Sequence, residues 1–329
     1  MFNRFACLLS STLWLAAAPA LAQPAPQPAQ NAPSTNAPST TVAPVTVEAA
    51  PKPKVIQQES HAFVQGYAAT PNAEIDQIGR WHDAVCVQVV GLVPEVAATV
   101  KARVEDVAKA VGLKLQKPGC TGDIEIVFSD RPQALMDAVA KKNEVVLGYF
   151  HRHEGGRLKT VTRPIQAWYM TATRGGAGPP VGALFGGVGN IEVHEEVIDD
   201  PENPPPTSCG DNPHFTHCLK SVFRNVLVVA DVNRLQGKDI GLLTDYIVML
   251  ALSQPKSLDG CGALPSVIDL LSPSGCPGRD APDGLTPADA AYLTALYTAD
   301  LEANKAGEQG DITNRMAKIL TKAAASGGR

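Results

Sequence analysis

Six of the seven cysteines lie beyond an N-terminal leader, and together with that leader they most strongly limit how this chain can fold. Arg4 precedes an apolar run at residues 5–18, and the small-residue stretch Ala20-Leu21-Ala22 follows it. A basic start, an apolar run too short to span a bilayer and a small-residue cleavage site are typical of a secretory signal peptide. We therefore expect residues 1–22 to be removed and the mature protein to be periplasmic or secreted.

Removal of the leader also removes Cys7 and leaves an even number of cysteines. In an exported protein this predicts disulfides rather than metal sites or nucleophiles. The cysteines fall into three separate groups along the chain, which favours the pairs Cys86–Cys120, Cys209–Cys218 and Cys261–Cys276. A zinc site formed by His214, His217 and the middle cysteine pair is the alternative, and the export signal favours the disulfide.

Composition divides the mature chain into a linker, a domain and a tail. Residues 23–61 are rich in Pro, Ala, Ser and Thr, and the sequence Asn-Ala-Pro-Ser-Thr occurs at 31–35 and again at 36–40. Such a segment buries too little apolar surface to offset its conformational entropy, so we expect a disordered tether. We expect residues 62–322 to form one domain and residues 323–329 to form a disordered tail.

Hydrophobic periodicity within the domain predicts an α+β fold with a mixed sheet and packed helices. We expect strands at residues 85–89, 123–128, 145–150, 165–173 and 222–232, with the third and fourth forming a hairpin. We expect helices at residues 94–111, 132–142 and 239–252, and another that begins near Thr286. The Gly- and Pro-rich stretch 174–218 is an unusually long loop, either functional or an insertion.

Charge argues against a nucleic-acid partner. Without the leader the chain has 27 Lys+Arg against 33 Asp+Glu, a net charge near −6. No block of lysines and arginines of the kind that follows a phosphate backbone occurs in the sequence. We expect no nucleic-acid partner and no transmembrane segment once the leader is removed.

The stretch 235–297 resembles the core of the zincin class of secreted zinc peptidases. In that family a catalytic helix ends in Leu-Gly-Leu, a Ser-Ile-Met-type turn follows, and a last helix opens with Leu-Thr/Ser-x-x-Asp. The corresponding segments here are Leu250-Ala251-Leu252, Pro265-Ser266-Val267, and Leu285-Thr286-Pro287-Ala288-Asp289 with Leu296-Tyr297. The resemblance implies a zincin-like scaffold, as in uncharacterised exported bacterial proteins with a C-terminal half of this kind.

The same comparison places Thr244-Asp245-Tyr246-Ile247-Val248 where the family carries His-Glu-x-x-His. Catalytic zinc in that motif needs two histidines one helical turn apart and a carboxylate as general base. Thr244 and Val248 cannot be these ligands, and Asp245 has no metal-bound water to deprotonate. The resemblance therefore implies a degenerate zincin without metal or cofactor.

A fold unrelated to zincins would explain the same residues. An apolar stripe is typical of a core helix, and it is formed here by Ile240, Leu243, Ile247 and Leu250. Thr286, Pro287 and Asp289 are residues that commonly begin a helix. Under both interpretations the helix with Asp245 is structural.

Other histidines give weaker signals. His194-Glu195-Glu196 has no second histidine at the required spacing, and as an acidic loop it is either solvated or a site for a hard cation such as calcium. His151 and His153 would share one face of a strand and could bind zinc, although both stand beside a Gly-Gly turn where exposed polar residues are common.

We expect an exported protein that acts through binding or structure, with an unidentified protein or cell-envelope partner. The alternative is a secreted hydrolase or metallopeptidase with an unrecognised site built from Asp245, His151, His153, His194 or His214. Histidines gathered around Asp245 would favour the enzyme. An envelope interaction module would instead expose an apolar patch outside any cleft.

Overall fold

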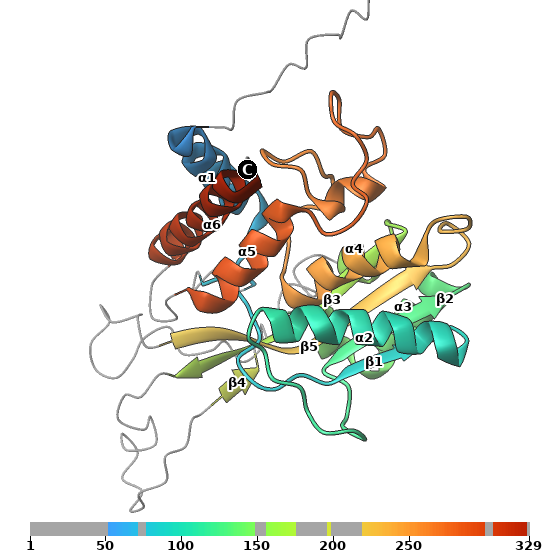
Figure 1. Cartoon of the computed structure of the whole chain (residues 1–329). Coiled ribbons are helices and arrows are strands. Elements are labelled where there is room, and N and C mark those ends of the chain that lie inside the picture. Colours follow the sequence, from blue (N-terminus) through green and yellow to red (C-terminus); the bar gives the residue numbers. More distant parts are fainter. Residues whose placement is uncertain are drawn as a thin grey trace, which may run out of the picture. The chain divides into compact units, whose positions relative to one another are not determined.

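The computed structural model describes residues 52–71, 77–148, 156–175, 196–198, 219–299 and 305–327. They lie within one compact unit, Ala49–Arg329. The fold is α+β, as predicted, with a five-stranded mixed sheet and helices packed around it (Figure 1).

The sheet combines parallel and antiparallel neighbours. Its order is β1 (Val87–Val90), β2 (Ile124–Ser129), β5 (Leu219–Asp231), β3 (Ile165–Gly175) and β4 (Glu196–Ile198). β1, β2 and β5 are parallel, whereas β3 runs antiparallel to both β5 and β4. On β2 burial alternates along the strand: Ile124, Ile126 and Phe128 are buried and the residues between them are more exposed, as the period of two predicts.

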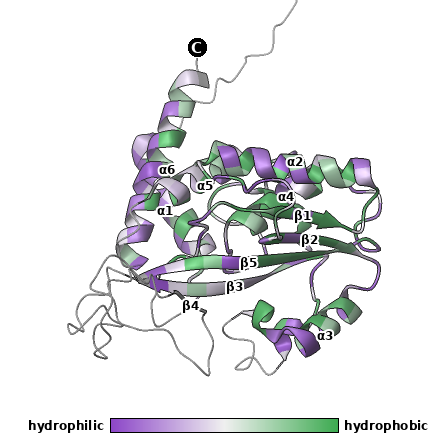
Figure 2. Ribbon diagram, turned by 90° about the horizontal axis from the view of Figure 1, so that it is seen from below, coloured by the Kyte–Doolittle hydropathy of each residue, from purple (hydrophilic) through white to green (hydrophobic). Residues whose placement is uncertain are grey.

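Helices cover both faces of the sheet (Figure 2). One face packs against α2 (Pro94–Ala110) and α4 (Ile240–Leu252), and these elements share the larger hydrophobic core. The other face packs against α3 (Pro132–Lys142), where Met136 and Trp168 belong to a smaller core. The short 3₁₀ turn η2 (Arg157–Lys159) borders this second core, and the Trp168 indole donates a hydrogen bond to the Leu158 carbonyl, at 2.6 Å.

Three helices gather at one end of the sheet: α1 (Pro53–Tyr67), α5 (Pro287–Thr298) and α6 (Lys305–Gly327) (Figure 1). α1 lies along α6, and the side-chain amide of Gln57 donates to the Asn314 side-chain oxygen at 2.9 Å. Both helices extend beyond the expected domain limits of 62 and 322. The polar residues around Gln57 look like linker, although Ile56, Ser60, Phe63, Val64 and Tyr67 form a buried helical stripe.

The predicted hairpin of residues 145–150 with 165–173 is wrong over residues 145–148, the part of the first strand that the structure describes. Glu144–Leu147 is a 3₁₀ turn, η1, that ends at Gly148, whose φ of 91° suits glycine. Leu147 packs into the smaller core, so its apolar neighbours belong to a buried turn rather than a strand. β3 pairs instead with β5.

Two of the three predicted disulfides are confirmed. Cys86–Cys120 joins the start of β1 to the loop after α2, with Cα atoms 6.1 Å apart, and Cys261–Cys276 closes a loop with Cα atoms 5.2 Å apart. Cys209 and Cys218 lie outside the described residues. Across the described ranges, every helix is too short or too polar to cross a membrane.

Candidate functional site

α4, which contains the segment Thr244–Val248, is a core helix. Asp239 caps its start by accepting a hydrogen bond from the Leu242 amide at 2.9 Å. From Leu243 to Leu252 every residue is buried. The Thr244 hydroxyl donates to the Ile240 carbonyl at 2.6 Å, and Val248 has no exposed surface. The two positions that would carry zinc ligands therefore face protein rather than a cleft.

Asp245 forms a structural ion pair. Its Oδ1 accepts from Arg103 Nε at 2.7 Å, and its Oδ2 accepts from Arg103 Nη2 at 3.2 Å. The Leu285 amide also donates to Oδ2, at 3.0 Å. Bidentate arginine–carboxylate geometry is both strong and directional. Asp245 thus joins α4 to α2 and to the segment that begins α5, and both of its oxygens have protein donors.

The C-terminal end of α4 is closed by side-chain donors. The last carbonyls of a helix lack intrahelical partners, and burying them unpaired would destabilise the fold. Here the donors come from Ser253 and from three aromatic residues outside the helix. Ser253 Oγ donates to the Met249 carbonyl at 2.7 Å, Tyr169 to Leu250 at 2.9 Å, Trp81 to Ala251 at 2.8 Å and Tyr297 to Leu252 at 2.7 Å.

Burial keeps the phenols in this region as neutral donors. It raises the pKa of Tyr169 and of Tyr297 far above the ordinary value. The aromatic rings also pack on one another, with Tyr169 and Phe223 centroids 5.4 Å apart and Trp81 and Phe223 centroids 5.7 Å apart. The end of α4 is therefore filled by aromatic side chains rather than open to a ligand.

The turn Pro265-Ser266-Val267 is tied to α5 through Asp289. Its carboxylate accepts from the Ser266 hydroxyl at 2.6 Å, from the Val267 amide at 2.8 Å and from the Thr286 amide at 2.9 Å. Thr286 is the N-cap of α5 and forms a capping box with Asp289, as predicted. Burial raises the pKa of Asp289, and these hydrogen bonds act in the opposite direction. One carboxylate thus fixes the turn and the start of the helix together.

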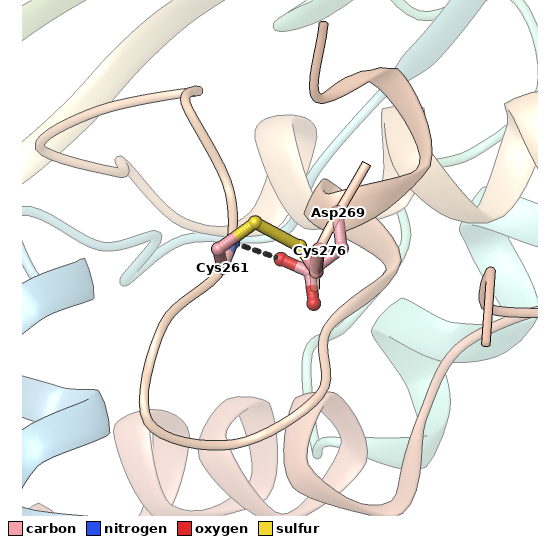
Figure 3. Close-up of side chains that lie close together, drawn as sticks. All are labelled: Cys261, Asp269 and Cys276. Atoms are coloured by element: carbon pink, nitrogen blue, oxygen red, sulfur yellow. Dashed lines mark hydrogen bonds between the residues drawn. A yellow bond between two sulfur atoms is a disulfide. The ribbon is translucent and has the colours of Figure 1, made fainter. Parts of the chain in front are cut away.

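Cys261, Asp269 and Cys276 lie close together beside this turn (Figure 3). Their ligand atoms lie within 4.8 Å of one another, and no other group of three or more His, Cys, Asp or Glu in the described ranges is close enough to share an ion. Both sulfurs are bonded to each other, so neither is a thiolate ligand. Asp269, which belongs to the 3₁₀ turn η4 (Val267–Leu271), accepts from the Cys261 amide at 2.6 Å and from the Ser266 amide at 3.1 Å. The cluster closes a loop.

The histidines proposed as alternative catalytic groups, His151, His153, His194 and His214, lie outside the described residues. The described histidines are His61 and His82. His61 pairs with Gln65 on the exposed side of α1, and His82 lies beside Asp83. Neither is a partner of Asp245. Arg103 could not be predicted from the sequence as the partner of Asp245. It lies on an exposed helix face, and the pattern of such a face does not indicate which cation bonds a buried acid.

His82 stands in a cationic environment. Arg174 bonds both carboxylate oxygens of Asp83, and Arg224 Nη1 lies 3.3 Å from Asp83 Oδ2. Burial, with the nearby Arg80, Arg174 and Lys220, lowers the pKa of His82 from 6.5 to about 4. The imidazole is therefore neutral at neutral pH.

This shift predicts a specific loss of stability in acid. His82 binds a proton near pH 6.5 in the unfolded chain and only near pH 4 in the folded protein. Between these values protonation favours the unfolded chain, so the free energy of unfolding is highest above pH 6.5 and decreases as the pH falls toward 4. We expect up to about 3 kcal/mol of unfolding free energy to depend on it. Denaturant titrations across this window should show a smaller decrease for His82→Gln than for the wild type. His61→Gln is the control, and an NMR titration of His82 with a pKa near 6.5 would contradict the prediction.

No family model, curated protein or solved structure matches this chain.

Proposed function

We propose that this chain is an exported protein that acts by binding, on a zincin-like scaffold whose catalytic positions have become structural. The main observation behind the proposal is that the Asp245 carboxylate accepts hydrogen bonds from Arg103 and from the Leu285 amide. A general base must hold a lone pair toward the water that it activates. In this fold three hydrogen bonds from Arg103 and from the Leu285 amide hold the carboxylate, and Asp245 is only 7% exposed, which leaves little access for such a water.

The positions of the two zinc ligands support the same proposal. Thr244 is 2% exposed and Val248 has no exposed surface. A metal at these positions would need a cavity beside the helix, which instead packs against the core on all sides. The tie between Asp289 and the Ser266 turn supports the view that helix, turn and closing helix are kept as one mechanical unit.

Two features support export. Residues 1–22 have the composition of a signal peptide, and the two described disulfides are of the kind that persists in oxidising compartments. N-terminal sequencing of the protein recovered from the cell envelope or medium is expected to begin at Gln23.

Metal analysis tests the non-catalytic part of the proposal. We expect the purified protein to contain less than stoichiometric zinc and to show no proteolysis that a chelator abolishes, because the helix offers no pair of ligands. Asp245→Asn should lower stability, since it breaks the Arg103 pair, and should leave both metal content and proteolysis unchanged. Stoichiometric zinc together with chelator-sensitive proteolysis would overturn the proposal.

A further inference from the structure

We propose that the end of the folded unit formed by the start of α1 and the second half of α6 binds the surface of an anionic membrane. We call this surface the basic end. It consists of Lys52 before α1, Lys54 and Val55 in α1, and Arg315, Lys318, Ile319 and Lys322 in α6.

Antiparallel packing of two helices brings these residues to one end. The start of α1 lies beside the C-terminal half of α6 (Figure 1), and the Gln57–Asn314 hydrogen bond fixes their register. Lys318, Ile319 and Lys322 follow Arg315 after three, four and seven residues, and the four therefore share one face of α6. The lysines among them are exposed, and the Arg315 side chain is 42% exposed.

The charge of the basic end is opposite to that of the chain. The chain carries a net charge of −5, yet no Asp or Glu occurs at residues 52–58 or 312–327. Along the sequence, the nearest described acids are Glu59 and Asp311, and Asp311 pairs with Arg315 at 2.9 Å. Asp300 and Glu302, between α5 and α6, lie outside the described residues. Residues 52–59 and 311–327 together therefore carry five cations and two acids.

A hollow lies on the same face of α6 and gives the basic end a shape as well as a charge. Its volume is about 380 Å³, and it is lined by Thr298, Asp311, Asn314, Arg315, Lys318 and Ile319. Arginine and lysine are the usual partners of phosphate oxygens, and Thr and Asn side chains supply neutral donors. The hollow therefore offers Thr298, Asn314, Arg315 and Lys318 as donors to a phosphodiester headgroup, while the Asp311 carboxylate in its lining is paired with Arg315.

Exposed apolar side chains stand among the cations. Val55 is 41% exposed and Ile319 is 36% exposed, and they are two of the four large hydrophobic residues exposed in the described structure. A basic helical face with a few apolar residues is typical of segments that lie on an anionic membrane. The apolar pair would enter the headgroup region while the lysines contact phosphates.

The proposed export favours a membrane as the occupant. Export to the cell envelope would place the folded protein beside membrane surfaces. The inference rests on the proposed function for the cellular location of the protein. The measurement of lipid binding does not depend on that location.

Vesicle binding tests the inference on the chain from Gln23 onward, which retains the whole unit Ala49–Arg329. Co-sedimentation is compared between vesicles of phosphatidylcholine alone and vesicles that also contain phosphatidylglycerol. We expect binding only to the anionic vesicles, and less of it as salt rises. The double variant Lys318→Gln/Lys322→Gln should bind about 30-fold more weakly, since each lysine near an anionic surface contributes about fivefold.

The matched control is Lys141→Gln/Lys142→Gln, which removes the same charge from the exposed end of α3 (Figure 2). It should bind like the wild type, and Ile319→Ser should weaken binding without changing its salt dependence. Equal loss in both lysine pairs, binding to neutral vesicles, or no vesicle binding would overturn the inference. So would complete competition by inorganic phosphate, which would indicate a small-anion site. None of these results depends on zinc content or proteolysis.

Discussion

Replacing Glu308 with alanine is expected to lower the free energy of unfolding by about 3–5 kcal/mol, which is the usual effect of leaving one partner of a buried ion pair alone. The Arg80 guanidinium pairs with Glu308, and these side chains are only 2% and 1% exposed. The same carboxylate accepts from the Ile78 amide at 2.8 Å, and Arg80 Nη1 donates to the Leu296 carbonyl at 2.6 Å. Without Glu308 the core would hold an uncompensated cation.

Denaturant unfolding monitored by circular dichroism measures this effect. The double variant Arg80→Met/Glu308→Leu should recover most of the lost stability, because well-packed apolar residues often replace a buried ion pair without loss. Asp106→Ala is the exposed control, since it breaks the surface pair with Lys109 and should change the free energy of unfolding little. A loss below about 1 kcal/mol in Glu308→Ala would show that Arg80 finds another partner or reaches water.

The second large effect is expected for Asp289→Ala, at about 3 kcal/mol. Asp289 has no exposed surface, and its removal leaves the Ser266 hydroxyl and the Val267 amide without their acceptor. An unsatisfied buried donor costs about 1–3 kcal/mol, and the cap of α5 is lost as well. Asp289→Asn keeps one accepting oxygen and should lose less.

Asp239→Ala provides the comparison for Asp289, because Asp239 also caps a helix but is exposed. Its loss should cost about 1 kcal/mol. If the two alanine variants lose equal stability, the bonds from Asp289 to the Ser266 turn contribute nothing beyond the cap. Protease cleavage within the 261–276 loop should increase in Asp289→Ala alone, since the turn that Asp289 holds lies inside that loop.

Local sequence signals predicted the parts of this fold that depend on neighbours along the chain. The alternation of Ile124, Ile126 and Phe128 gave β2, and Thr286 with Asp289 gave the start of α5. The grouping of cysteines gave the disulfides Cys86–Cys120 and Cys261–Cys276. In each case the residues that decide the structure lie in one segment or in one pair of cysteines.

Features that depend on distant residues were not predictable in this way. The ion pair of Asp245 requires Arg103, and these residues are 142 positions apart in the sequence. Val145 to Leu147 has the composition of a strand, yet the core beneath Met136 and Trp168 accommodates it as a turn. The start of α1 could not be predicted because its first residues are polar. Its apolar stripe is buried only because α6 packs against it.

The capped end of α4 also bears on the order in which this protein can fold. Its carbonyls are satisfied by Trp81, Tyr169 and Tyr297, which come from three widely separated parts of the chain. A chain that emerges N-terminus first cannot complete this core until Tyr297 is available. The helix end should therefore open only with the whole domain, and its amide protons should exchange among the last.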